Sequence, residues 1–501
     1  MTPTVSSGRR GRELPVFPLS PDPVRADVGR DAQAVRLDVE PIGPYGGPRI
    51  ALVTLGCDKN TVDSERIMAT LIGHGARVSS DPVGADVVII NTCGFIQAAK
   101  EESIETILDA CRMKEQGDVR AVVAVGCMVE RYPQELAAEI PEVDLFLGLG
   151  GLSRLIPELR KRGLLPEASV PLIKQPLRVL TAGTGHSSYL KISEGCDHTC
   201  AFCAIPLMRG LHRSAPVEDL VQEAAALARQ GVRELNIVSQ DTTWYGRDLR
   251  RKDPAAPLLA DLLEALLERT GVDWYRLFYM YPTGITPPMV ELLARASRPG
   301  ATSTGVSRIL PYLDMPLQHG SDRILAAMHR PERQKTIRER VRWLRDAIPD
   351  LTLRTTVIVG FPGETDADFQ EMLDLLEELR FDRVGAFAYS PEDDTPAAAM
   401  ADQVPESLRR ERLEELLDAQ RMIGLEQNLE LIGAVRTVLV DRIVDEDDDF
   451  ALLARTEGQA LDVDGVTWIV PEGAEGARPG DFLQVEIVDA GEHDLTARVA
   501  P

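Results

Sequence analysis

The sequence has no excess of positive charge, few aromatic residues and no long apolar run. Its net charge is −24, so bulk electrostatics disfavours nucleic acid, whose phosphates need Lys and Arg, although a local basic patch stays open. Aromatic residues make up only 5%, so base-stacking platforms are scarce. No run of about 18 apolar residues and no apolar signal segment is present. We therefore expect a cytoplasmic protein without a membrane span.

Cysteine is also sparse, with seven residues in a chain of 501. In a long intracellular chain such cysteines are more often metal-binding or catalytic than parts of a disulfide framework. The apolar share of 44% and the charged share of 27% are those of a globular protein. The length is enough for about three domains of roughly 150 residues each.

Composition and periodicity divide the chain into four parts. Residues 1–48 are rich in Pro, Gly, Arg and Asp without apolar periodicity, which predicts a disordered extension. Residues 49–160 and 182–414 both alternate strands with helices, which predicts parallel sheets covered on both faces. Residues 415–501 read as short strands with glycine turns, which predicts a small antiparallel β-barrel.

The elements within these parts can be placed from their periodicity. A loop-rich linker is expected over 151–181 and a charged amphipathic helix over 405–430. About six β/α units in the central part predict a full or partial parallel barrel, whose chemistry belongs at the carboxyl ends of its strands. The predicted strands are Ile50–Leu55, Ala85–Asn91, Val119–Val125, Tyr189–Ile192, Glu234–Val238, Trp274–Met280, Tyr312–Met315, Thr352–Val359 and Arg383–Ala388.

Three cysteines lie close together directly after the first strand of the central part. Cys196, Cys200 and Cys203 form a Cys-x3-Cys-x2-Cys loop. An iron–sulfur cluster normally takes four protein thiolates, so three would leave one iron open to a small molecule. A zinc site with His198 as the fourth ligand is the alternative. The spacing and its context favour the cluster.

Three further cysteines are far apart in the sequence but equivalent in position. Cys57, Cys93 and Cys127 each follow a predicted strand of the N-terminal part. Carboxyl ends of neighbouring parallel strands meet at one edge of a sheet, where ligands bind. We expect a second three-cysteine cluster there; three small buried apolar residues are the alternative. Cys111 lies inside a helical stretch without partner spacing, which indicates a packing role.

The loop with Phe202 before its last cysteine resembles the radical S-adenosylmethionine (SAM) pattern. In that superfamily the open iron binds SAM, which the reduced cluster cleaves to a 5′-deoxyadenosyl radical. Together with the N-terminal triad, residues 49–501 resemble the methylthiotransferases, which have an N-terminal cluster domain, a radical SAM barrel and a C-terminal TRAM barrel. The resemblance implies two [4Fe–4S] clusters and SAM as cofactors, with Cys196, Cys200 and Cys203 holding the catalytic one and Cys57, Cys93 and Cys127 the auxiliary one.

Residues at predicted strand ends are candidate contacts for SAM or substrate. These are Phe202, Gln240 and Asp241, with Gln318 and His319 as further polar candidates. Radical SAM enzymes place the SAM adenosine near a glycine turn such as Gly360–Gly363. An ordinary β/α turn is the alternative for the glycines, and a structural role is the alternative for His319.

Several strings resemble the RimO-type branch of the family, which modifies an aspartate of the twelfth protein of the small ribosomal subunit at its β-carbon. Gly320-Ser321-Asp322 instead resembles the branch that modifies tRNA adenosine. The strings that resemble the ribosomal branch are Leu55–Asn60, Asn91–Ile96, Tyr189–Cys196, Gln240–Thr242, Pro316–His319 and Tyr389–Glu392.

The charge of the C-terminal part bears on the substrate independently. Residues 431–501 contain five Arg, no Lys and sixteen Asp or Glu, a net charge of −11, with an acidic run over Asp445–Asp449. Such a module should repel tRNA phosphate and suits a basic ribosomal protein, although the acidic run is also typical of a solvated turn. We predict a methylthiotransferase for that protein, which also needs a low-potential electron donor and a sulfur donor. The alternatives are a tRNA adenosine methylthiotransferase and a non-catalytic iron–sulfur RNA-binding protein.

Overall fold

The computed structural model describes residues 46–167, 178–180, 185–298, 308–444 and 449–500. The chain divides into two compact units, residues 1–176 and 177–501, which are described separately. Nearly all of the predicted N-terminal extension and most of the acidic run lie outside the described residues. No helix in the described ranges has the length and apolar character needed to cross a membrane.

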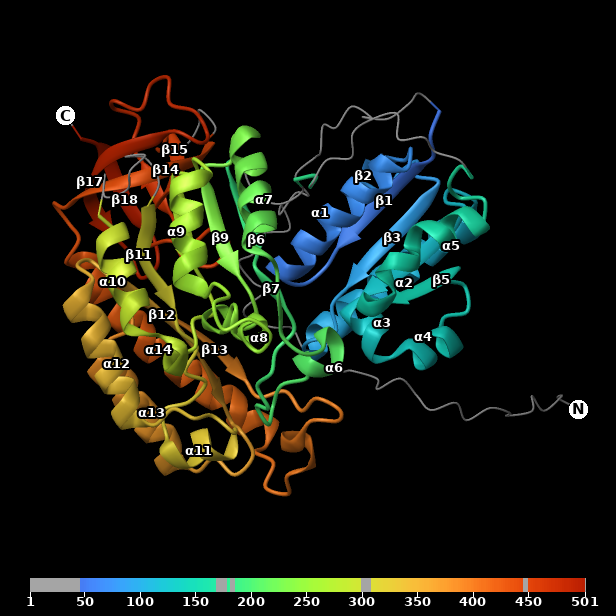
Figure 1. The fold of residues 1–501 in the computed structure, drawn as a ribbon. Helices are drawn as coiled ribbons and strands as arrows, with labels where there is room; N and C mark the ends of the chain where they lie inside the picture. Colours follow the sequence, from blue (N-terminus) through green and yellow to red (C-terminus); the bar gives the residue numbers. More distant parts are fainter. Residues whose placement is uncertain (1–45, 168–177, 181–184, 299–307, 445–448, 501) are drawn as a thin grey trace, which may run out of the picture. The chain divides into compact units, whose positions relative to one another are not determined.

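The first unit contains a five-stranded parallel sheet in the order β2-β1-β3-β4-β5. Every residue of β3 and β4 is buried, as expected for strands covered on both faces (Figure 1). The strands are β1 Arg49–Thr54, β2 Arg77–Ser79, β3 Val87–Thr92, β4 Ala121–Gly126 and β5 Leu145–Gly148, and the helices are α1 Asp58–Gly73, α2 Gln97–Gln116, α3 Cys127–Arg131, α4 Pro133–Glu139 and α5 Leu155–Lys161.

The start of the expected loop-rich linker is helical, so that prediction was wrong. Residues Leu149–Arg154 form a 3₁₀ turn, and α5 follows directly. Leu155, Ile156 and Leu159 of this short helix are buried. A helix of seven residues is marginal alone and depends on tertiary packing, which the local pattern does not reveal.

The second unit begins with six parallel strands in the order β13-β12-β11-β10-β9-β6, with β6 and β13 at the two edges. This is the predicted partial barrel. Helices cover its outer face (Figure 1). The strands are β6 Ser187–Lys191, β9 Glu234–Val238, β10 Trp274–Leu277, β11 Arg308–Asp314, β12 Thr352–Val359 and β13 Arg383–Ala388, and the longer helices are α7 Val217–Arg229, α9 Leu259–Arg269, α10 Pro287–Ala296, α12 Gln334–Ala347, α13 Asp366–Leu379 and α14 Glu406–Leu429.

Short elements surround the loop that follows β6 and complete this part. They are β7 Ser193–Glu194, α6 Ile205–Arg209, β8 Arg213–Ser214, α8 Arg247–Arg250 and α11 Asp322–Ala327, with 3₁₀ turns at Thr242–Trp244, Pro282–Gly284 and Pro396–Ala399. The predicted charged helix is α14, and the expected domain boundary at residues 414/415 falls inside it.

The C-terminal part is the predicted small barrel, closed in the order β14-β15-β16-β18-β17. One feature was predicted wrongly, because β16 and β18 pair in parallel while the other neighbours are antiparallel. A ring with an odd number of strands cannot alternate direction throughout, so one parallel pair is unavoidable. The strands are β14 Val435–Ile443, β15 Leu452–Thr456, β16 Thr467–Ile469, β17 Phe482–Ala490 and β18 Leu495–Val499.

Buried charges join this C-terminal barrel to the amino ends of the central strands. Glu234, the first residue of β9, lies 3.0 Å from Arg276 of β10 and 2.7 Å from Arg455 of β15. Arg455 also pairs with Asp441 at 2.7 Å, and Asp441 contacts His186 at 2.9 Å. Each of these side chains is almost wholly buried. The C-terminal barrel is thus fixed to the central domain through ionic groups.

The turn after β15 adds a second set of contacts at the same end of the sheet. Glu457 pairs with Arg308 and accepts a hydrogen bond at its carbonyl from Arg276. The Tyr312 hydroxyl donates to Asp464 at 2.8 Å, and Arg354 lies 3.7 Å from the same carboxylate. Residues 456–464 therefore close the amino end of the central barrel, which leaves its carboxyl end for ligands.

Candidate functional site

The Cys-x3-Cys-x2-Cys loop follows β6 and β7 at the carboxyl end of the central sheet. Gly195 has a φ of +74°, and a Cβ there would lie 2.3 Å from the Leu211 carbonyl oxygen, so only glycine fits. The Cys196 amide donates to the Gly210 carbonyl at 3.0 Å, and the Ala201 amide donates to Met328 at 3.0 Å. The loop is therefore held from both sides by backbone contacts.

The three thiols of this loop lie close enough to influence one another electrostatically. Burial raises the pKa of Cys196 to about 12, and Cys200 adds to the increase. Burial likewise raises the pKa of Cys203 to about 12, with contributions from Cys200 and Cys196. The pKa of Cys200 is raised by burial too. The three thiols are thus near neighbours, although in the described part of the chain no three His, Cys, Asp or Glu side chains are placed closely enough to hold a metal ion without rearrangement.

Asp241, a predicted cofactor residue, holds the side chains around the loop. One of its oxygens lies 2.7 Å from His198 Nε2, and the other accepts from the amide and hydroxyl of Thr243. His198, the candidate fourth ligand for zinc, is thereby engaged by a carboxylate. Its ring also stacks on Tyr281 at 4.1 Å and contacts Trp244 edge-on at 5.0 Å. Asp241 thus orients His198 within an aromatic group.

The other predicted contacts for SAM or substrate have mixed surroundings. Phe202 is half-buried and packs against an apolar cluster that includes Ala201 and Phe361. Gln240 is partly exposed, and its side chain has no hydrogen bond within the described ranges. Gln318 adopts a φ of +76° and pairs through its backbone with Val357. Within the described ranges, the side-chain amides of Gln240 and Gln318 are both without a hydrogen bond and both partly exposed.

The glycine turn after β12 is built around Glu364. Gly360 and Gly363 both have positive φ angles, +71° and +80°. The buried Glu364 carboxylate accepts from the Gly360 amide at 2.7 Å and pairs with Arg412 at 2.8 Å. His319 Nε2 also lies 3.2 Å from Glu364, and its Nδ1 accepts from the Ser321 amide. His319 is therefore a satisfied structural histidine.

The N-terminal cysteines lie where the strand pattern placed them, at the carboxyl ends of three adjacent strands. Cys57 follows β1, Cys93 follows β3 and Cys127 follows β4. Thr92 and Gly126 are paired across β3 and β4, so Cys93 and Cys127 leave the sheet side by side. A Cβ on Gly56 would lie 2.7 Å from the Cys93 sulfur, which places that sulfur against the segment carrying Cys57.

Asn60 connects these three segments, a role that sequence reasoning missed. Its amide nitrogen donates to the Leu55 carbonyl at 2.8 Å and to the Thr92 carbonyl at 3.1 Å. Its amide oxygen lies 3.7 Å from the Cys127 sulfur. Asn60 is fully buried in the first turn of α1. Its position three residues after Cys57 was a signal that could have revealed it.

Cys111 contrasts with the two triads. It is buried in the apolar core beside Ile107 and Ala110, which confirms its predicted packing role. The seven cysteines of the chain thus form two sets of three plus one core residue. Each set supplies three sulfur donors, whereas a fully ligated cluster takes four. Three donors fit a cluster with one open iron.

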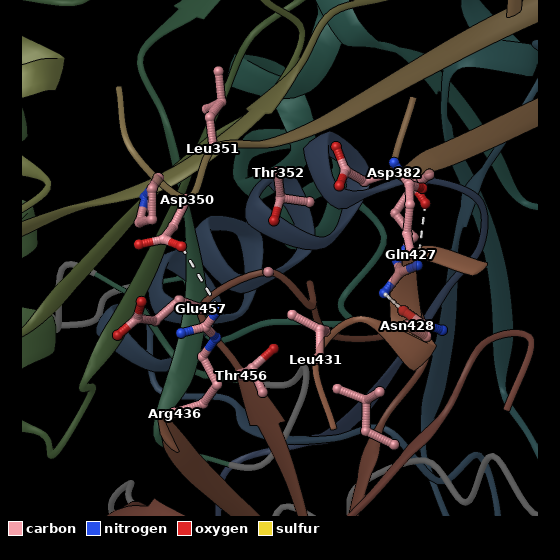
Figure 2. Close-up of a pocket in the computed structure, with 14 residues that line it drawn as sticks. Asp350, Leu351, Thr352, Asp382, Gln427, Asn428, Leu431, Arg436, Thr456 and Glu457 are labelled. Carbon is pink, nitrogen blue, oxygen red and sulfur yellow. Dashed lines mark hydrogen bonds and ion pairs between the residues drawn. The ribbon is translucent and has the colours of Figure 1, made fainter. Parts of the chain in front are cut away.

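Figure 2 shows a cavity in the second unit. The residues that line it place it at the amino end of the central sheet, whereas the cysteine loop follows the carboxyl end. The cavity is lined by residues near the starts of β12 and β13, among them Leu351 and Asp382, together with Leu431 and Glu457. Arg436 spans it to Asp350 at 3.6 Å. No sequence-predicted site residue lines it, and it belongs to the joint between the central domain and the C-terminal barrel.

Three family models match separate parts of the chain. Residues 49–148 match an uncharacterized protein family, UPF0004, residues 190–376 match the radical SAM superfamily, and residues 432–500 match the TRAM domain. Among solved structures, the radical SAM methyltransferase TsrM from Kitasatospora setae is 14% identical, with a TM-score of 0.49 over 82% of this chain and 92% of that chain.

Curated relatives match nearly the whole chain. Ribosomal protein uS12 methylthiotransferase RimO of Anaeromyxobacter sp. (strain Fw109-5) is 44% identical over 90% of this chain and 93% of its own length. The protein of the same name from Desulforudis audaxviator (strain MP104C) is 43% identical over 90% of this chain and 97% of its own length. The chain therefore belongs to the RimO family of methylthiotransferases, radical SAM enzymes that use SAM and [4Fe–4S] clusters.

Proposed function

We propose that this enzyme adds a methylthio group to the β-carbon of an aspartate in ribosomal protein uS12. The choice of uS12 as substrate is supported by relatives that are named for uS12 and match about nine-tenths of the chain. The observation that carries the chemistry is the placement of two cysteine triads, each at the carboxyl edge of a parallel sheet. Two open sites suit a reaction that must both activate a carbon and deliver sulfur.

We assign Cys196, Cys200 and Cys203 to the cluster that binds SAM, and the triad of Cys57, Cys93 and Cys127 to the auxiliary cluster. When bound, these groups supply the electron that cleaves SAM and an open iron for the incoming sulfur. A radical route is needed because the carbon-bound hydrogen of the substrate has no useful acidity at neutral pH. Electrons at about −400 mV must come from a low-potential donor, and sulfur from a separate donor.

The chain's own residues fix the start of the catalytic loop and line its surroundings. Glu194 lies 2.6 Å from Lys191 and 2.7 Å from Arg209. Burial alone would raise the pKa of Glu194, but these two cations hold it at about 2, so the carboxylate stays charged. We propose that Gln240 contacts SAM or substrate directly and that Asp241 acts through His198. We propose that the SAM adenosine lies near the turn from Gly360 to Gly363, where the Arg409 side chain already packs against Gly360.

Charge supports a basic protein substrate. Several acids of the C-terminal part form ion pairs where this part contacts the central domain, so they add little to its surface charge. Asp441, Glu457 and Asp464 each lie beside an arginine there. The rest still gives that part an acidic surface, which would repel tRNA and steer a basic protein toward it. A ribosomal substrate places the enzyme in the cytoplasm. Exposed acids on this surface are Asp449, Asp462, Glu472, Glu475, Asp481, Asp489 and Glu492.

The string that resembled the tRNA-modifying branch has local structural roles here. A Cβ on Gly320 would lie 2.5 Å from the Met372 Cα, so packing requires glycine. Ser321 donates to Asp368 at 2.8 Å, and Asp322 accepts from the Gln334 amide at 2.7 Å. These contacts explain the three residues without reference to a substrate, and we favour uS12 over tRNA.

The test uses full-length enzyme reconstituted anaerobically with iron and sulfide, then supplied with SAM, a reductant and purified uS12. We expect 5′-deoxyadenosine and a mass increase of one methylthio group on a uS12 aspartate. Unmodified tRNA incubated in parallel should stay unchanged. A methylthio-adenosine product with unmodified uS12 would overturn the proposed substrate.

Matched cysteine variants separate the roles of the two triads. Replacing Cys196, Cys200 and Cys203 by Ala should abolish 5′-deoxyadenosine formation. Replacing Cys57, Cys93 and Cys127 should leave SAM cleavage but abolish methylthio transfer. The control is Cys111→Ala, a buried cysteine outside both triads, which should retain both activities. SAM cleavage by the first triple variant would contradict the assignment of the catalytic cluster.

A further inference from the structure

Cys200 has a hydrogen-bonding partner that the reaction described above does not use. The hydroxyl of Tyr281 lies 3.3 Å from the Cys200 sulfur. Tyr281 follows β10 at the carboxyl end of the sheet and is mostly buried. A thiolate bound to iron can only accept a hydrogen bond, so in the loaded enzyme the phenol is the donor.

The Tyr281 ring lies between two side chains. The His198 ring stacks on it at 4.1 Å with planes only 7° apart. The Arg330 guanidinium carbon lies 3.6 Å from the same ring centroid. Two flat groups this close cannot share one face, so His198 and Arg330 cover opposite faces of the tyrosine. This sandwich fixes the direction of the hydroxyl.

Arg330 brings a buried positive charge to this sandwich. Its side chain is 2% exposed and donates to the Pro316 carbonyl at 2.8 Å. A cation over the ring withdraws electron density from the phenol and makes its hydroxyl a stronger donor. The guanidinium thus lies on the ring whose hydroxyl contacts the Cys200 sulfur at 3.3 Å.

Glu332 opposes this charge. Its side chain is 1% exposed and lies 3.2 Å from Arg330 Nε. Neither carboxylate oxygen has a hydrogen bond within the described part of the chain. A buried positive and a buried negative charge therefore lie side by side next to the tyrosine that contacts the Cys200 sulfur.

We infer that Tyr281, with Arg330 and Glu332 behind it, sets the reduction potential of the cluster held by Cys200. The inference rests on the proposed role of this cysteine. Reduction adds negative charge to a cluster, so a hydrogen bond to its sulfur or a nearby cation stabilises the reduced form, and a nearby anion destabilises it. These three side chains are positioning residues, since they act through the cysteine.

The test measures the potential directly. Full-length enzyme with Cys57, Cys93 and Cys127 replaced by Ala carries only the catalytic cluster, and its midpoint potential is followed by electron paramagnetic resonance. In this background Tyr281→Phe and Arg330→Gln should each move the potential to more negative values. Glu332→Gln should move it to less negative values. Arg340→Gln is the matched control, because Arg340 covers the ring of Trp343 on α12 at 5.1 Å, and it should cause no shift.

Opposite signs for the two charge variants are the decisive outcome, because a general disturbance of the loop would move both in the same direction. Equal potentials in all variants, or shifts of equal sign for Arg330→Gln and Glu332→Gln, would overturn the inference. If Tyr281→Phe fails to bind iron, the potentials of Arg330→Gln and Glu332→Gln still test the inference. Failure of the parent enzyme to cleave SAM would instead count against the proposed function.

Discussion

At the scale of single residues, the cysteines differ in how far they are exposed to solvent. Cys57 is exposed, whereas Cys196 and Cys203 are partly buried and lie beside another thiol. A buried thiol resists ionisation because the protein solvates the thiolate less well than water does. Iron must therefore displace protons from these two sulfurs, and the surrounding protein alone does not keep them ionised.

This difference predicts how the metal-free, reduced enzyme reacts with iodoacetamide. Because burial raises the pKa of Cys196 and Cys203 to about 12, their alkylation at pH 8 should be slower than that of Cys57 by roughly tenfold or more. Their rate should still rise about tenfold for each pH unit between 8 and 10. Peptide mass spectrometry gives the rate at each cysteine. A rate that levels off near pH 8.5 at Cys196 would contradict the prediction.

Asn60 makes a second prediction at this scale. Asn60→Ala removes two hydrogen bonds to backbone carbonyls and the contact with Cys127, so the auxiliary triad should lose its arrangement. Bound iron after reconstitution should fall to about half, while SAM cleavage persists, since two equal clusters are expected. Asn428→Ala is the control, because it removes contacts to Gly491 and Glu492 in the other unit. Full iron content in Asn60→Ala would refute this role.

At the scale of elements, the strands could be predicted because buried parallel strands appear as short continuous apolar runs. β9, β12 and β13 have the predicted bounds. The position of the cysteines could be predicted for the same reason, since strand ends fix where the next residues lie. Elements of three or four residues, such as β2 and β5, escaped prediction because they carry too little pattern.

The sequence could not reveal how side chains of different elements meet. Tyr281 and Cys200 are separated by 81 residues, and Arg330 lies further along the chain. Their encounter depends on the lengths of the intervening helices and turns, which no local pattern specifies. The same holds for Asp241, whose strand-end position was predicted but whose partner, His198, was not. Positions of candidate residues followed from the sequence, whereas their pairing required the fold.

At the scale of the whole molecule, the ionic joint between the central domain and the C-terminal barrel predicts a dependence of stability on pH. Burial alone would raise the pKa of Glu234, but Arg455 and Arg276 hold it at about 2, below its value of about 4.3 in an unfolded chain. Glu234 therefore contributes stability above about pH 4.3, and this is lost as pH falls toward 2. Glu234→Gln leaves two buried arginines underpaired and should cost about 3–5 kcal/mol at pH 7.

Urea unfolding of the wild type and Glu234→Gln at pH 7, 5 and 3.5 measures this effect. The difference in unfolding free energy should be largest at pH 7 and should shrink at pH 3.5. Glu218→Gln is the control, because Glu218 pairs with Arg269 at the exposed surface and its loss should change stability little. A difference that is the same at pH 7 and pH 3.5 would contradict the assigned pKa of Glu234.

The closed amino end of the central barrel also bears on how this family can be engineered. A truncation before β14 would leave Glu234 without Arg455, Arg276 without the Glu457 carbonyl and Arg354 without Asp464. We expect such a fragment to lose stability for reasons unrelated to substrate recognition, because buried charges lose their partners. Chimaeras that exchange C-terminal barrels between ribosomal and tRNA enzymes must therefore transplant the matching joint residues with them. The sequence marks the C-terminal barrel as a separate domain, but the shared ion pairs make the stability of the central domain depend on it.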